Sequence, residues 1–197
     1  MKDIIIWVGL WYLVWGIYNV YFRWSWEKLK SKKYIPRGLY FLFSFFIIFI
    51  VFKDILFFYS DSLVLSLLAT NLIGLILNYD RKYYKKFNKD RLFILFQSFN
   101  ILYQQASIVV AIYLIKSLLA NGYSDLYFGL FFGIIHLPLL FMPWIKLKYI
   151  LVAGCFVIGT VFSYLILNYK FGLPTAFIIH YLYYAWEIYY LKDEEKI

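Results

Sequence analysis

Among the polar side chains inside the apolar stretches of this chain, five on one stretch and two histidines on others are best suited to chemistry. Four of them follow one another at intervals of three and four residues, namely Gln97, Asn100, Gln104 and Ser107. This spacing places them on one stripe of a helix, with the fifth, Gln105, about 100° around the axis. The histidines, His136 and His180, lie in two other apolar stretches, and Tyr184 follows His180 by one helical turn. Because an unpaired polar group in hydrocarbon costs several kcal/mol, we expect three helices to point these groups at one buried pocket.

An amide stripe opposite two imidazoles permits hydrogen bonding and proton transfer. We expect Tyr184 or the Gln amides to be the hydrogen-bond partners of both rings, and Gln97 and Asn100 mainly to link helices. Two histidines could bind zinc, but a third anionic or imidazole ligand is missing, so neither a metal nor a cofactor is expected. Glu187 lies two turns beyond His180 and is interpreted as an interfacial residue.

The stretches that carry these groups have the length and composition of transmembrane helices. The 197 residues are 64% hydrophobic and 25% aromatic, and their mean hydropathy of +0.71 lies outside the range of soluble domains. Apolar segments of about 20 residues, the length that a span needs, occur seven times. They are 4–22, 38–52, 62–79, 92–119, 126–144, 149–167 and 174–191. We therefore expect an all-α, polytopic integral membrane protein, 1–197 forming a single membrane domain with about seven transmembrane helices. The many Tyr, Phe and Trp side chains are interpreted as lipid-facing and interfacial anchors.

The distribution of Lys and Arg predicts how the seven segments are oriented in the membrane. Sixteen of the 20 Lys and Arg lie between or after spans on one predicted side, and only Lys2, Lys53, Lys116 and Lys170 lie on the other. Since Lys and Arg in short loops stay in the cytoplasm, we expect the N-terminus outside and the C-terminus cytoplasmic. The net charge of +9 is thus explained by topology and by contact with the lipid bilayer, and no nucleic-acid partner is expected.

The local context of the histidines resembles a known family. The run from Phe131 to Pro138, with Phe132 before His136, looks like the Phe-x-x-x-His motif of the CAAX protease and bacteriocin-processing (CPBP, or Abi) intramembrane endopeptidases. The run from Gly172 to His180 is similar to the last motif of that family, which continues as His-x-x-x-Asn/Asp. The pair Gln104-Gln105 stands where the family has the Glu-Glu of Glu-Glu-x-x-x-Arg-Gly. The resemblance covers about 92–191 and preserves the order of the motifs.

The departures from the family pattern concern the catalytic positions. The resemblance implies that Gln104, Gln105, His136, His180 and Tyr184 occupy catalytic positions, and Asn100, Phe132 and Ser107 would line the pocket. In the family the Glu is thought to activate water, while the histidines and the Asn orient it or stabilise the oxyanion. Here Gln104 and Gln105 replace the acidic pair, Val109 replaces the Arg, and Tyr184 replaces the Asn or Asp. Because Gln cannot accept a proton near neutral pH, the family mechanism should fail.

Three functions are compatible with these residues. The first is a degenerate family member, a pseudoenzyme that binds a membrane peptide or protein partner in a regulatory or immunity role. The second is an active intramembrane endopeptidase that uses another base, for instance His136 with water. The third is a small-solute transporter or channel whose path is the amide and imidazole stripe.

Overall fold

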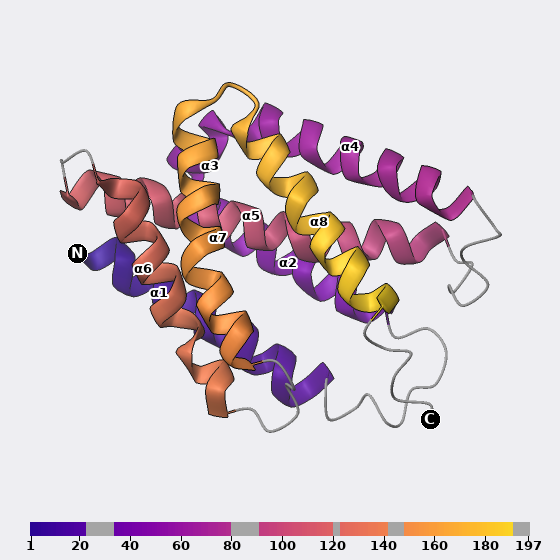
Figure 1. The fold of residues 1–197 in the computed structure, drawn as a ribbon, viewed down its shortest axis with the longest axis horizontal. Coiled ribbons are helices and arrows are strands. Elements are labelled where there is room, and N and C mark those ends of the chain that lie inside the picture. Colours follow the sequence, from indigo (N-terminus) through magenta and orange to yellow (C-terminus); the bar gives the residue numbers. More distant parts are fainter. Residues whose placement is uncertain (23–33, 80–90, 120–122, 142–147, 191–197) are drawn as a thin grey trace.

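The chain folds into helices of very different lengths (Figure 1). The computed structural model describes residues 1–22, 34–79, 91–119, 123–141 and 148–190, and these form helices and no strand. The elements are α1 (Lys2–Ile17), the π-helix η1 (Tyr18–Phe22), α2 (Tyr34–Val51), α3 (Lys53–Phe58), α4 (Ser60–Tyr79), α5 (Arg91–Leu119), α6 (Ser124–His136), the 3-10 helix η3 (Leu137–Phe141), α7 (Lys148–Asn168) and α8 (Gly172–Tyr190). The all-α prediction is confirmed for the part of the chain that the structure describes.

Four segments are long and apolar enough to cross a membrane. They are Lys2–Val20, Leu95–Leu119, Ser124–Phe141 and Lys148–Asn168. The apolar helices Ile35–Val51 and Ser60–Ile76 correspond to two further predicted spans but are shorter. The prediction of about seven spans is therefore not confirmed, whereas a membrane protein with several apolar helices is supported.

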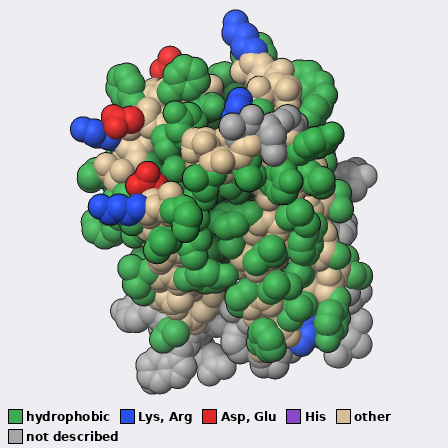
Figure 2. Space-filling model, turned by 90° about the vertical axis from the view of Figure 1, so that its left-hand side faces the viewer, with side chains coloured by type: hydrophobic (Ala, Val, Ile, Leu, Met, Phe, Trp, Pro, Cys, Tyr) green, Lys and Arg blue, Asp and Glu red, His purple; other side chains and the backbone are tan. Residues whose placement is uncertain are grey.

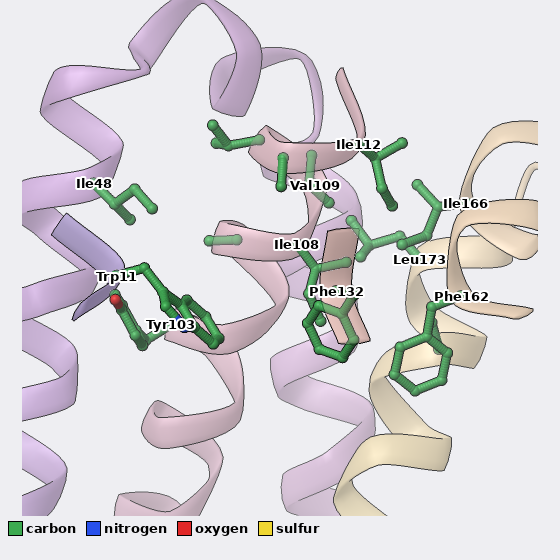
Figure 3. Close-up of a cluster of buried hydrophobic side chains, with 14 of the residues drawn as sticks. Trp11, Ile48, Tyr103, Ile108, Val109, Ile112, Phe132, Phe162, Ile166 and Leu173 are labelled. Carbon is green, nitrogen blue, oxygen red and sulfur yellow. The ribbon is translucent and has the colours of Figure 1, made fainter. Parts of the chain in front are cut away.

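Helix α5 is the central element of the fold. Every residue of 101–112 is buried, and α1, α2, α3, α4, α6 and α8 all contact this helix. Figure 3 shows Ile108 of α5 beside Phe132 of α6, with Ile112 facing Ile166 of α7 and Leu173 of α8. A helix that is apolar on nearly all sides can be buried in this way, and its few polar groups must then meet protein. This burial is what positions the candidate site.

Helices α6 and α7 pack closely because glycines line their interface. Gly129 and Gly133 form a Gly-x-x-x-Gly motif on α6, and a Cβ atom added to Gly129 would lie 2.8 Å from the carbonyl oxygen of Phe156 on α7. On α7, a Cβ at Gly159 would lie 2.9 Å from the Cβ of Phe132. Small residues let two backbones approach, which is a main source of helix association in membranes.

The α-helical part of α6 is shorter than the predicted span 126–144. It ends at His136 and continues as η3 through Leu137–Phe141. Pro138 explains the change, because its nitrogen carries no hydrogen and cannot donate to the carbonyl of the preceding turn. His136 is thus the last α-helical residue before the change of geometry.

The surface carries apolar side chains as a lipid-facing protein would. Helix α2 exposes Leu39, Phe43, Phe46 and Ile50, each more than half exposed and all on one stripe. Figure 2 shows hydrophobic side chains covering most of one face, with charged side chains mainly toward its upper and left edges. Such an extended apolar surface would be a liability in water and is ordinary in a bilayer.

Candidate functional site

One polar side-chain contact in this region joins α5 to α8. Gln105 Nε2 lies 3.0 Å from His180 Nδ1. Because the amide nitrogen can only donate, Nδ1 of His180 is the acceptor and its proton lies on Nε2. Gln105 is fully buried, and its Oε1 accepts no hydrogen bond among the described residues. The fourth and seventh apolar segments therefore meet through Gln105, which lies about 100° around the helix from the predicted stripe.

The stripe predicted on the fourth segment is buried but mostly bonded within its own helix. Gln104 Nε2 donates to Asn100 Oδ1 at 3.0 Å, and Ser107 donates to the carbonyl of Tyr103 at 2.9 Å. Within the described part of the chain, Gln97 Nε2 and Asn100 Nδ2 are buried without a partner. The expectation that Gln97 and Asn100 mainly link helices is thus wrong for these two nitrogen atoms.

A neighbouring serine makes the link between helices instead. Asn71 Nδ2 of α4 lies 3.1 Å from Ser98 Oγ of α5, and Ser98 itself donates to the carbonyl of Leu95 at 2.7 Å. Ser98 lies on the side of α5 that also carries Gln105, seven residues earlier in the chain. This side of α5 therefore makes polar contacts with both α4 and α8.

His136 is bonded to its own helix and enclosed by aromatic rings. Its Nδ1 lies 2.6 Å from the carbonyl oxygen of Phe132. Since a carbonyl can only accept, Nδ1 carries the proton and Nε2 holds the lone pair. The rings of Phe132 and Trp11 lie 4.4 Å and 5.9 Å from the imidazole, between centroids. The prediction that Tyr184 or a Gln amide would be the partner of His136 is wrong at Nδ1, because the helix supplies a nearer acceptor.

The two imidazoles carry opposite tautomers. Both side chains are partly buried, and the ring of Phe162 lies 5.7 Å from that of His180. His136 presents an acceptor at Nε2, whereas Nε2 of His180 is a donor.

Helix α1 covers this site, which its amino-acid sequence alone does not indicate. Trp7 Nε1 donates to the carbonyl of Ser107 at 2.9 Å, and Trp11 stacks on Tyr103 with centroids 6.3 Å apart. Trp7 and Trp11 are 1% and 5% exposed, so their interpretation as interfacial anchors is wrong. Trp7, Trp11 and Val14 follow one another at intervals of four and three residues, which places them on one face of α1 but does not tell a buried face from a lipid-facing one.

Two predicted residues lie outside the described side chains. Tyr184 and Glu187 belong to α8 by their backbone, but their side chains are not described. Among the side chains that are described, His, Cys, Asp and Glu form no group of three or more that could hold a metal ion. Asp125 of α6 instead accepts a hydrogen bond from the buried Ser163 of α7 at 3.1 Å.

Comparison with known proteins adds no relative to this description. No family model, no curated protein and no solved structure matches the chain.

Proposed function

We propose that this protein binds a membrane peptide or a transmembrane protein partner at the site formed by Gln105, His136 and His180, without cutting it. In this proposal the chain is a degenerate member of the CAAX protease and bacteriocin-processing family with a regulatory or immunity role. It is a multi-pass membrane protein of about seven spans, with its N-terminus outside and its C-terminus cytoplasmic.

The hydrogen bond between Gln105 and His180 is the observation that carries this proposal. It joins the position of the family glutamate to the position of the last family histidine, and it leaves Gln105 Oε1 as a buried acceptor to which no described residue donates. His136 Nε2 is a second acceptor to which no described residue donates. Buried acceptors are costly until a donor arrives, and the main-chain N–H groups of a peptide are suitable donors.

The same contacts are unfavourable for the activation of water by a general base, which is the chemistry of the family. A general base must take a proton from water, and an amide oxygen does not do so near neutral pH. Gln105 already donates to His180, and Gln104 donates to Asn100, so both amides act as neutral hydrogen-bonding groups. General-base assistance is typically worth about 10² to 10⁴ in rate, which is the loss expected at this position.

One observation favours a second candidate, an active endopeptidase. The lone pair on His136 Nε2 is not used by any described residue, and an imidazole can serve as a general base. In that case His180 would supply a hydrogen-bond donor from Nε2 to the developing oxyanion. The two candidates differ in one outcome, because only the enzyme cleaves what it binds.

The test is to measure binding and cleavage by the purified chain in detergent. The probes are a prenylated C-a-a-X peptide and a single-span transmembrane peptide, each carrying a fluorophore and a quencher. We expect binding of at least one peptide without cleavage. Gln105→Leu should weaken that binding about 2-fold to 10-fold, the value of one hydrogen bond. Gly154→Ala, on an open surface of α7, is the matched control and should bind as the parent does.

Two outcomes would overturn the proposal. Cleavage that disappears in His136→Ala would establish the active endopeptidase. Absence of binding for both peptides, in a preparation whose thermal unfolding is cooperative, would remove the peptide-binding function.

A further inference from the structure

A separate group of polar atoms lies where the end of α1 meets the start of α2. Trp15 Nε1 and Arg37 Nε are both buried donors that have no acceptor among the described residues. An indole N–H and a guanidinium N–H rarely stay unpaired in a protein interior, because each loses its hydration without compensation. Two such donors from two helices therefore indicate an acceptor that none of the described residues supplies.

The ring of Tyr18 contacts both residues. The Arg37 guanidinium carbon lies 5.2 Å from the centroid of this ring, and the Trp15 ring lies 5.5 Å from it. Phe41, one turn after Arg37, packs 5.2 Å from Tyr18 and 5.6 Å from Trp15. The junction is fixed by a hydrogen bond of 2.7 Å from the Tyr40 hydroxyl to the carbonyl of Val14.

The charge of Arg37 is not neutralised within the described part of the chain. No described carboxylate forms a salt bridge with it, and the described Asp residues begin other elements or the far end of α1. They are Asp3, Asp54, Asp61 and Asp125, in the first turns of α1, α3, α4 and α6. An anion at this junction would therefore meet the Arg37 cation and the Trp15 N–H, with no competing carboxylate among the described side chains.

We propose that Trp15 and Arg37 bind the phosphate group of a membrane phospholipid. Arginine and indole donors suit phosphate oxygens, and Trp, Tyr and Arg are the residues that anchor a protein at the headgroup level of a bilayer. Apolar side chains flank the junction for the acyl chains, since Ile17 and Val20 of the α1–η1 segment and Leu39 of α2 are 44%, 74% and 51% exposed. These exposed apolar groups favour a lipid over free phosphate.

The test is a lipid titration of the detergent-purified protein followed by native mass spectrometry. The probe is dioleoylphosphatidylglycerol, with inorganic phosphate as a second arm. We expect a retained lipid adduct that Arg37→Gln weakens about tenfold, since hydrogen bonds to a charged group and the attraction of one cation are lost. Trp15→Phe keeps an aromatic ring and loses the N–H, and it should weaken binding about 2-fold to 10-fold.

Lys170 provides a matched control. Its Nζ lies 5.6 Å from the ring centroid of Phe171, a cation beside an aromatic ring as at Arg37, but it is exposed. Lys170→Gln should bind the lipid as the parent does. If Arg37→Gln does not fold, Arg37→Lys replaces it in the test. This variant keeps the positive charge and loses only the guanidinium fork, so it should weaken lipid binding less than tenfold.

Three results of the lipid titration are possible, and each supports or overturns the phospholipid site. Loss of the adduct in Arg37→Gln and Trp15→Phe but not in Lys170→Gln supports the proposal. Equal binding by the parent, Arg37→Gln and Trp15→Phe overturns it. Displacement of the lipid by inorganic phosphate would show a free-phosphate site instead, which also overturns the assignment to phospholipid.

Discussion

Replacing glycine by alanine should change the free energy of unfolding in opposite directions at Gly129, in the contact between α6 and α7, and at Gly154, on an open surface of α7. In Gly129→Ala the new Cβ would lie 2.8 Å from the backbone oxygen of Phe156 and would also meet Thr160 Oγ1. Ordinary contact needs about 3.5 Å, so the helices must separate by about 0.7 Å. The obstacle is main chain, which cannot rotate away, and α7 must shift as a body.

The magnitude follows from two opposing effects. Overpacking a well-packed interface costs about 1 to 3 kcal/mol, whereas replacing Gly by Ala inside a helix gains about 0.5 to 1 kcal/mol. Because the obstacle at Gly129 is main chain, the cost lies in the upper part of that range, about 2 to 3 kcal/mol, so Gly129→Ala should lower the free energy of unfolding by about 1 to 2.5 kcal/mol. Gly154→Ala meets nothing within 4 Å and should raise it by up to about 1 kcal/mol.

Thermal unfolding in one detergent, followed by intrinsic tryptophan fluorescence, measures both variants. Using roughly 2 to 4 °C per kcal/mol, the midpoint of Gly129→Ala should fall by roughly 2 to 10 °C while that of Gly154→Ala stays or rises. A shift of the same sign and size in both variants would refute the close α6–α7 contact. The position of His136, two turns after Gly129 on α6, would then also be in error.

Two further predictions concern α1 and the topology. Trp7→Phe keeps the buried ring but removes the indole donor to the Ser107 carbonyl, so the free energy of unfolding should fall by about 0.5 to 2 kcal/mol in the same assay; an unchanged midpoint would contradict the contact. Cysteines placed at Asn88 and at Asn121 in a Cys155→Ser background should react with an impermeant maleimide from opposite sides of sealed vesicles, and reaction from one side would contradict the proposed topology.

Much of the helical layout could be predicted because apolar length is a strong signal in a membrane protein. The segment predicted at 92–119 is observed as Arg91–Leu119, and the segment predicted at 149–167 as Lys148–Asn168. The pairing of Gln105 with His180 was also within reach, because polar groups inside apolar helices must find one another. In each case one physical requirement, the apolar length of a span or the pairing of buried polar groups, leaves few possible structures.

The remaining features depend on which helix faces which, and periodicity does not contain that information. The spacing of Trp7 and Trp11 defines a face of α1, but the same spacing fits a lipid-facing stripe and a buried one. The sequence did not predict the partner of His136 either. Its Nδ1 bonds to the Phe132 carbonyl, one turn earlier in the same helix, instead of to a side chain from another helix. Local backbone acceptors compete with distant side chains wherever geometry allows them.

The proposed loss of catalysis is consistent with the charge of the site as a whole. At the position where the family has arginine, Val109 is 1% exposed and lies in an apolar cluster with Ile108 and Ile112 (Figure 3). A carboxylate at Gln105 would therefore be buried without a cation, at a cost that exceeds the gain from one hydrogen bond to His180. A neutral amide donating to a neutral imidazole needs no countercharge. The amide at position 105 and the valine at position 109 are thus compatible with each other. Gln105→Glu alone or Val109→Arg alone would place an unpaired charge in the core.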